Sequence, residues 1–409
     1  MRIPSPGSTS WRTSYTVAYE ARQKAVREDV EGCTTIYLDN AATSFPKPGC
    51  TIQAMASALT RCGANPGRAG HKLSIEAGRI MEGCREAIAA MLGETDATRV
   101  AFAQNATDAL NMAIHGVLRS GDHVISTLLE HNSVLRPLSE LSRSGIITLT
   151  LIPPDSDGRI NAQEVERALT PRTRLVAMTH MSNVLGLAQN IAAVGAMCKR
   201  RGVLLLVDCA QTAGHLPLSP RAWGCSLLAM PGHKGLLGPH GTGALWVAPD
   251  VTLAPLRQGG TGSASESMFQ PRMMPDSLES GTQNLPGIAG LHAGMRFALA
   301  HRAQMHEQTV ALCDFMREEL LGLPHLRVYT LRGASLLSFN IEGLGSQEAA
   351  SALDSMNIAV RGGLHCAPGV HRFLGTLAGG AIRVSPGLMN EKKDAVALVQ
   401  AVARLARGA

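Results

Sequence analysis

The segment VLLLVDCAQ, residues 203–211, decides the fold of this chain. Five consecutive apolar residues, 203–207, predict a strand buried on both faces, as in a parallel sheet covered by helices. Asp208 follows that strand directly, at the place where open α/β sheets bind ligands. An isolated buried carboxylate is costly, so Asp208 needs a partner. A bound cationic heterocycle would serve, and so would a backbone or water donor.

The neighbouring sequence repeats this pattern on both sides. From about residue 50 to 290, short apolar runs alternate with helical patterns, which indicates a parallel sheet with crossover helices. The strands that we expect cover 35–38, 99–103, 123–127 and 175–179, and the helices cover 106–118 and 191–201.

Beyond about residue 295 the pattern changes. A long helix-compatible stretch over 294–320 precedes a strand at 335–341, a helix at 347–356 and a strand at 382–385, which suggests a smaller α+β domain. We therefore expect a large α/β domain at 35–293 and a small C-terminal domain at 294–409. Residues 1–34 form an N-terminal extension, with a helix-compatible stretch at 19–30.

The composition narrows the class of protein. Of 409 residues, 45% are apolar and 17% charged, and the net charge is +6, which excludes disorder over most of the chain. The basic cluster at 199–201 is short and lacks interleaved aromatics, so nucleic-acid binding has little support. No apolar run reaches the roughly 20 residues of a membrane span, and residues 1–32 lack the features of a secretory signal. Nine cysteines without a C-x-x-C pair suggest reduced thiols in a cytoplasmic protein.

Three further segments carry chemistry at the expected ends of strands. QNATD at 104–108 opens a helix, whose free N–H groups and a hydroxyl could cradle a phosphate or simply cap the helix. EHN at 130–132 offers a histidine, a weak signal alone. MPGHKG at 230–235 places Lys234 among glycines and apolar residues, where desolvation would make it a better nucleophile, although a surface turn is equally compatible. Walker A, nucleophile-elbow and zinc-binding motifs are absent.

The order of these features is more specific than any one of them. A phosphate cradle, a histidine, Asn183 in a loop, Asp208 and then Lys234 match the needs of pyridoxal 5'-phosphate (PLP). That cofactor requires a phosphate site, a carboxylate on its pyridinium nitrogen and a lysine for a Schiff base.

At this point the chain resembles the class V, fold-type I PLP enzymes of the cysteine desulfurase and selenocysteine lyase group. The resemblance runs from about residue 36 to 390 and implies a large domain with a mostly parallel, seven-stranded type of sheet. The motifs that carry it are YLDNAATSFPKP (37–48), NPGRAGHKLS (65–74), EHNS (130–133), MSNVLG (181–186), VDCAQ (207–211), GHKGLLGPHGTG (232–243), GGTGSAS (259–265), ESGTQN (279–284), RGGLHC (361–366) and RVSPGLMN (383–390).

The resemblance also implies roles for individual residues. Lys234 would form the Schiff base, with Asp208 on the pyridine nitrogen, Gln211 on the ring hydroxyl and His131 stacked on the ring. The phosphate would meet Ala106, Thr107 and His233, together with Thr282 from the partner subunit of a homodimer. The substrate carboxylate would bind Asn183 and Arg383, and Arg361 is a further substrate-binding candidate.

The spelling R-x-G-x-H-C at 361–366 resembles the sulfur-mobilising branch of the family. In that branch the cysteine, here Cys366, acts as a thiolate nucleophile and works with a separate sulfur acceptor. His365 and Arg361 are the candidates to stabilise the thiolate. A single cysteine can also be a small buried apolar residue, and this is the expectation for most of the other eight.

One position departs from the family pattern. Where similar enzymes have Ser or Thr two residues before the histidine of the His-Lys pair, this chain has Pro231. A phosphate-binding hydroxyl is therefore missing, and we expect compensation by the cradle at 105–107 or by Thr261.

The sequence thus predicts a PLP-dependent L-cysteine desulfurase that forms alanine and a persulfide on Cys366, which passes to an acceptor protein or a small thiol. Three alternatives stay open at this point: a selenocysteine lyase or specialised C–S lyase, a class V aminotransferase or epimerase, and a scaffold without turnover. No nucleic acid, membrane or metal is expected as a partner.

Overall fold

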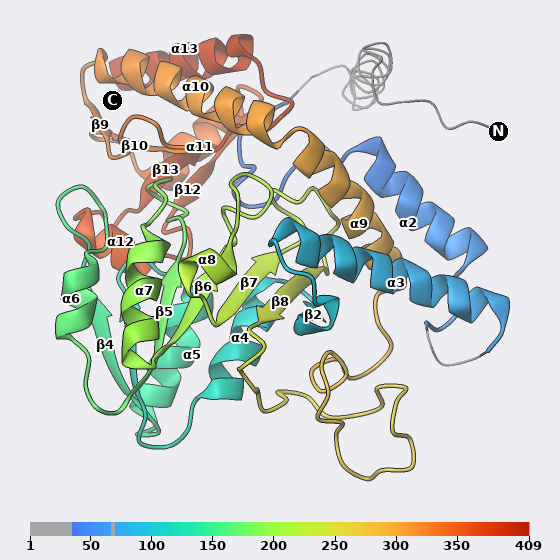
Figure 1. Cartoon of the computed structure of the whole chain (residues 1–409). Coiled ribbons are helices and arrows are strands. Elements are labelled where there is room, and N and C mark those ends of the chain that lie inside the picture. Colours follow the sequence, from blue (N-terminus) through green and yellow to red (C-terminus); the bar gives the residue numbers. More distant parts are fainter. Residues whose placement is uncertain (1–34, 67–69, 409) are drawn as a thin grey trace.

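The computed structural model describes residues 35–66 and 70–408, so the predicted helical stretch at 19–30 lies outside the described residues. Its centre is a seven-stranded sheet in the order β2-β8-β7-β6-β5-β3-β4 (Figure 1). The strands are β2 (Val100–Ala103), β3 (His123–Thr127), β4 (Thr148–Ile152), β5 (Thr173–Thr179), β6 (Leu204–Asp208), β7 (Leu227–Pro231) and β8 (Gly243–Val247).

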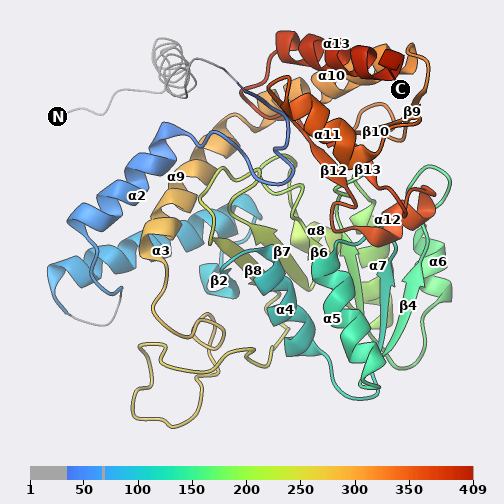
Figure 2. The same cartoon turned by 180° about the vertical axis from the view of Figure 1, so that it is seen from behind.

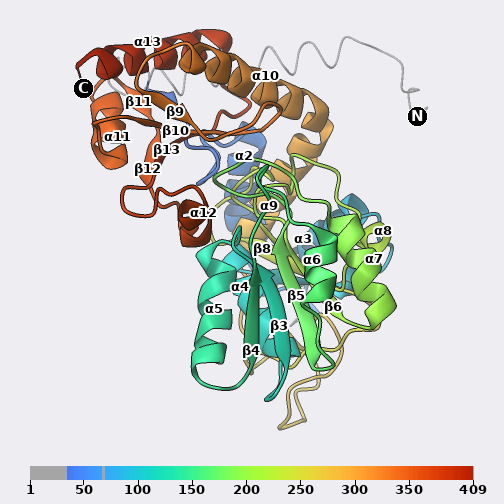
Figure 3. The same ribbon diagram turned by 90° about the vertical axis from the view of Figure 1, so that its left-hand side faces the viewer.

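Five neighbouring strands of this sheet, β7-β6-β5-β3-β4, run parallel, and β8 runs antiparallel to both of its neighbours. Figure 3 shows helices on both faces of the sheet, α4 and α5 on one and α6, α7 and α8 on the other. The helices are α4 (Ala106–Val117), α5 (Asn132–Arg143), α6 (Ala162–Arg167), α7 (Ile191–Arg201) and α8 (Pro220–Trp223). The predicted mostly parallel α/β architecture is confirmed.

A second, smaller sheet is antiparallel, in the order β12-β13-β10-β9. Figure 2 shows α10, α11 and α13 around it and the helices α2, α3 and α9 beside the central sheet. The elements are β9 (Leu326–Val328), β10 (Leu337–Ile341), β12 (Arg361–Gly363), β13 (Ala381–Val384), α2 (Gly49–Arg61), α3 (Lys72–Met91), α9 (Leu285–Ala300), α10 (Arg302–Leu321), α11 (Ser346–Asp354), α12 (Pro368–Phe373) and α13 (Lys392–Gly408).

The segment that precedes α2 crosses to this smaller part of the molecule. Strand β1 (Ile36–Tyr37) pairs in parallel with β11 (Ile358–Ala359), and Leu38 packs in the apolar core formed mainly by residues 312–406. The motif at 37–48 therefore begins at one core and continues toward the other.

The helix-compatible stretch at 294–320 is helical in the structure except at one residue. The structure has two helices there, α9 and α10, which meet at His301 with φ −114° and ψ 8°, outside helical geometry. The His301 ring hydrogen-bonds with the Phe297 carbonyl oxygen at 2.9 Å, at the end of α9. The predicted domain boundary at 293/294 falls inside α9 and stays a prediction.

A buried ion pair ties α3 to the segment that precedes α9. The Arg85 guanidinium donates to both carboxylate oxygens of Glu279, at 2.7 and 3.1 Å, and both side chains are almost fully buried. Glu279 also accepts the Phe102 amide at 2.6 Å, and Arg85 donates to the Val100 carbonyl. Over the described residues, the helices are too short or too polar to cross a bilayer.

Candidate active site

A cavity of about 280 Å³ opens where the strands of the central sheet end. Its walls come from residues that follow β2, from the last residues of β5, β6 and β7, and from β12 and β13 of the smaller sheet. The predicted site residues that it brings together are Ala106, Thr107, His131, Asn183, Asp208, Gln211, His233, Lys234, Arg361 and Arg383. Thr282 and Cys366 do not line the cavity, and both are exposed.

Lys234 lies in the loop after β7 and faces this cavity. Burial, with the nearby Arg383 guanidinium next in weight, lowers the pKa of Lys234 to about 8. Within the described chain, its Nζ has no hydrogen-bond or ion-pair partner. A neutral, unpartnered amine is the state in which a lysine forms a Schiff base or takes a proton.

The motif at 37–48 holds the backbone on which Lys234 sits. The His233 carbonyl oxygen accepts from Lys47 Nζ at 2.6 Å and from Thr43 Oγ1 at 3.1 Å. The Ser44 hydroxyl donates to the Lys234 carbonyl oxygen at 3.0 Å. Sequence reasoning quoted this motif but missed its function, because hydrogen bonds across about 190 residues leave no local pattern.

Asp208 is the last residue of β6, and its side chain is buried. Its carboxylate accepts one hydrogen bond, from the Ala210 amide at 2.8 Å, and has no salt-bridge partner within the described chain. Burial raises the pKa of Asp208, whereas the Ala210 amide and the charge of Lys234 lower it. This under-satisfied carboxylate fits the protonated pyridine nitrogen of PLP.

The start of α4 offers an anion site on the wall of the same cavity. Asn105 caps the helix by accepting the Asp108 amide at 2.9 Å, and the amides of Ala106 and Thr107 have no partner within the described chain. His233 adds a buried Nδ1 that likewise lacks a partner there. Unpaired amides at a helix start and an unpaired ring nitrogen fit the phosphate of PLP.

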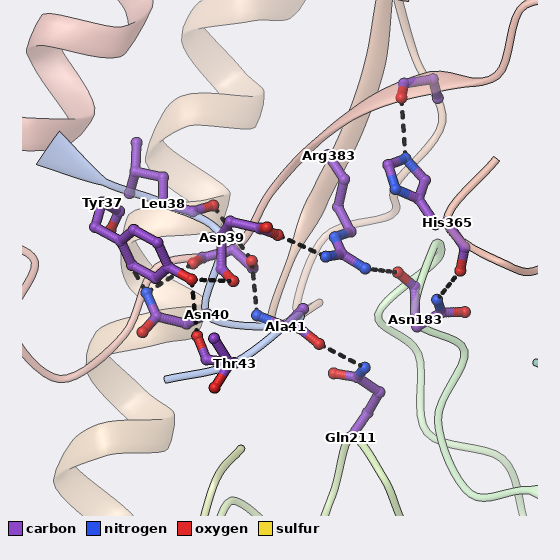
Figure 4. Close-up of polar contacts among 12 residues, drawn as sticks. Tyr37, Leu38, Asp39, Asn40, Ala41, Thr43, Asn183, Gln211, His365 and Arg383 are labelled. Carbon is purple, nitrogen blue, oxygen red and sulfur yellow. Dashed lines mark hydrogen bonds and ion pairs between the residues drawn. The ribbon is translucent and has the colours of Figure 1, made fainter. Parts of the chain in front are cut away.

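His131 lines the same cavity. Its Nδ1 accepts the Ser133 amide at 3.0 Å, so this nitrogen carries no proton. Burial, with the charge of Lys234 next, lowers the pKa of His131 to about 4, and the ring is neutral near pH 7. Gln211 donates to the Ala41 carbonyl oxygen at 3.1 Å, which holds its amide at the cavity wall (Figure 4).

Two arginines face the cavity from adjacent strands. Arg361 of β12 and Arg383 of β13 are register partners in the antiparallel pair. Arg383 is only 1% exposed, forms an ion pair with Asp39 at 2.6 Å and donates to the Asn183 carbonyl oxygen at 3.3 Å (Figure 4). Sequence reasoning missed Asp39, although the motif at 37–48 contains it.

The loop from β12 to α12 carries Cys366. Two consecutive residues, His365 at φ 50° and Cys366 at φ 56°, adopt the left-handed conformation that favours glycine. Asn183 Nδ2 donates to the His365 carbonyl oxygen and the Asn132 amide to the Cys366 carbonyl oxygen, each at 2.7 Å. These two bonds hold a strained loop in place.

The imidazole of His365 points away from solvent. Its Nε2 hydrogen-bonds with the Ala381 carbonyl oxygen at 2.9 Å, and burial, with Arg383 next, lowers its pKa to about 3. A neutral ring cannot supply the positive charge that was expected to stabilise a thiolate at Cys366. This arrangement leaves Arg361 as the candidate for that charge.

The chain is similar to known proteins over most of its length. The family model described as "Aminotransferase class-V" matches residues 36–398. A probable cysteine desulfurase of Methanothermobacter thermautotrophicus is 33% identical over 91% of this chain and 95% of its own length. A cysteine desulfurase of Klebsiella pneumoniae is 32% identical over 84% of this chain and 86% of its own.

Solved structures of cysteine desulfurases also superpose on this chain. The apo structure of a cysteine desulfurase from Thermococcus onnurineus superposes with a TM-score of 0.87 at 29% identity, covering 94% of this chain and 98% of that one. The cysteine desulfurase CsdA of Escherichia coli superposes with a TM-score of 0.83 at 27% identity, covering 93% of this chain and 97% of that one. These matches confirm the predicted resemblance and the fold-type I architecture.

Proposed function

The chain belongs to the class V aminotransferase family, and from this membership and the site we propose that it is a PLP-dependent cysteine desulfurase. It would convert L-cysteine to L-alanine and hold the sulfur as a persulfide on Cys366. The observation that carries the proposal is a hydrogen bond that connects the cavity to the loop of Cys366. Asn183 lines the cavity beside Arg383, and its side-chain amide holds the loop that presents Cys366.

The unpaired groups of the cavity suit PLP. Asp208 would hold the ring nitrogen and Gln211 the ring hydroxyl, with the neutral His131 against the ring. The unpaired amides of Ala106 and Thr107 would hold the phosphate. When bound, PLP supplies an electron sink that stabilises negative charge at the substrate α-carbon.

The residues around the cofactor would divide the work on L-cysteine. Arg383, with Asn183 beside it, would bind the α-carboxylate, since a guanidinium offers two parallel donors. Arg361, which lines the same cavity, would be a second hydrogen-bond donor to the substrate. Lys234, neutral above about pH 8, would take the proton from the α-carbon onto Nζ.

The sulfur would then move to Cys366. Its thiolate attacks the substrate sulfur, an S–S bond forms, and the Cβ–S bond breaks with its electron pair left on the three-carbon fragment. That fragment takes up two protons, the α-proton back from Lys234 Nζ and, at the β-carbon, the proton that the Cys366 thiol lost on ionisation. It then leaves as alanine, so the balance is L-cysteine plus thiol to L-alanine plus persulfide. Because Cys366 is exposed, an acceptor protein or a small thiol can reach the persulfide.

A homodimer completes the proposal. The segment that joins β8 to α9 projects from the body of the molecule (Figure 1). It carries Met268, Phe269 and Met273, which are 97%, 84% and 79% exposed. Thr282 follows on the same segment and also lies outside its own cavity. A second copy that covers these apolar side chains would place Thr282 toward the partner's phosphate site.

Mass spectrometry after incubation with PLP and L-cysteine tests the function. We expect one added sulfur on the peptide that contains Cys366, and loss of both persulfide and alanine formation in Cys366→Ala. Cys50→Ala, at a half-buried thiol, is the matched control and should behave as wild type. The proposal fails if Cys366→Ala forms alanine and sulfide at the wild-type rate.

Steady-state kinetics and identification of the product separate the alternatives. A selenocysteine lyase would show a much higher kcat/KM for selenocysteine than for cysteine and little dependence on Cys366, since selenium is the better leaving group. An aminotransferase would yield a keto acid in place of alanine, and a scaffold would show no turnover.

A further inference from the structure

Pro231 leaves a gap in the hydrogen-bonding groups around the anion site at the start of α4. It lines the cavity at the end of β7 and pairs with Gly243 of β8. Gly243 lies so close to Asn105 that a Cβ there would be 2.8 Å from the Asn105 carbonyl carbon. Pro231 thus borders the start of α4, and a proline brings neither an N–H nor a hydroxyl.

The first expected substitute, Thr261, lies elsewhere. Its hydroxyl is within hydrogen-bond distance of Ser263, and it does not line the cavity. The second, the cradle at 105–107, is in place but offers one hydroxyl, that of Thr107. Any further hydroxyl must come from another element.

Ser133, the second residue of α5, brings a further hydroxyl next to Thr107. It lines the cavity and is 9% exposed. Its Oγ lies 2.7 Å from Thr107 Oγ1 and 2.8 Å from His131 Nδ1. Ser133 contacts Thr107 from α5, the strand partner of Pro231 approaches Asn105, and both Ser133 and Pro231 line the cavity together with residues 105–107.

The proton of the Ser133 hydroxyl is free to turn toward a ligand. His131 Nδ1 already accepts the Ser133 amide at 3.0 Å, so it keeps a donor when the hydroxyl rotates away. Thr107 Oγ1 can then donate to Ser133 Oγ, which leaves the Ser133 proton available to a ligand in the cavity that Ser133 lines. The nearby Asp108 carboxylate does not oppose an anion here, because Arg257 pairs with it at 2.9 Å.

We propose that Ser133 donates its hydroxyl proton to the phosphate of PLP and so replaces the hydroxyl that Pro231 lacks. The inference rests on PLP being the cofactor. Phosphate recognition then combines the first turns of two helices of 12 residues each, α4 and α5, whose N-terminal ends both favour negative charge.

A comparison of PLP with pyridoxal, which lacks the phosphate, tests this role. Cofactor-free protein is titrated with each compound, and binding is followed by absorbance. A hydrogen bond to a charged group implies that Ser133→Ala weakens PLP binding roughly 10- to 100-fold. Pyridoxal binding should not change, because only PLP presents a phosphate.

Matched variants complete the design. Ser139→Ala, on the exposed side of the same helix, should leave both affinities unchanged. Ser133→Thr keeps a hydroxyl and should bind PLP nearly as wild type does. Adding Pro231→Ser to Ser133→Ala should recover most of the loss, because it restores a hydroxyl on the other side of the cradle.

Two results would overturn the proposal. One is equal PLP affinity in Ser133→Ala and wild type. The other is an equal loss for PLP and pyridoxal, which would mean that Ser133 acts only by orienting His131. Thermal melting of each cofactor-free variant shows whether it folds, and Ser133→Cys provides the same comparison if Ser133→Ala does not. Failure of the wild type to bind PLP would instead refute the proposed cofactor.

Discussion

Removing the charge of Glu279 should destabilise the protein strongly. In Glu279→Gln the buried Arg85 guanidinium keeps its charge and loses its bidentate partner. Breaking a buried pair in this way costs about 3–5 kcal/mol, because the remaining charge stays in a low-dielectric environment. The Phe102 amide also loses a carboxylate acceptor.

Thermal unfolding of the cofactor-free protein measures this cost. For a domain of this size we expect a decrease in Tm of roughly 6–15 °C. The control is Glu82→Gln, which removes a half-exposed carboxylate 3.4 Å from the same arginine and should shift Tm by little. The double variant Arg85→Met with Glu279→Leu should recover much of the loss, since an apolar pair needs no charge compensation.

The reasoning is refuted if Glu279→Gln melts within about 1 °C of Glu82→Gln, because the buried pair would then contribute no more than a surface one. The test also bears on function. Glu279 opens the motif ESGTQN, so the ion pair fixes the segment that carries Thr282 against β2.

Three further predictions concern the site. In the cofactor-free protein, Lys234 should react with PLP with a midpoint near pH 8 in place of 10.5, because burial favours the neutral amine; stopped-flow absorbance with a midpoint above 10 would contradict this. Asn183→Ala should speed alkylation of Cys366 by iodoacetamide several-fold, since the loop that carries Cys366 loses the hydrogen bond from Asn183 to the His365 carbonyl oxygen. An unchanged rate would mean that this hydrogen bond does not hold the loop. Gly214→Ala should lower the free energy of unfolding by at least about 2 kcal/mol and weaken PLP binding. The reason is that φ of Gly214 is 88° and that a Cβ there would overlap the carbonyl oxygen of Gly235, the residue after Lys234. Gly145→Ala, at φ 70° with open space around it, is its melting control.

Much of the fold could be predicted from local patterns. The strand at 123–127 and the helix at 191–201 have the predicted bounds, since a short run with β-branched residues and a helical periodicity are local signals of these elements. The break at His301 could not be predicted, because residues 294–320 carry no Pro or other clear stop signal. Motif order likewise indicated the cofactor chemistry, whereas no motif gave Ser133 or Asp39 a role.

The sequence by itself determined the class of sheet, the chemistry-bearing residues at its edge and the family resemblance, because apolar runs, turn residues and motif order are local properties. Tertiary structure alone decided which groups meet. It placed Asp39 on Arg383, Ser133 beside Thr107 and the amide of Asn183 on the loop of Cys366. The physical reason is that burial and hydrogen bonding depend on neighbours from distant segments, and these set the charge and freedom of each side chain.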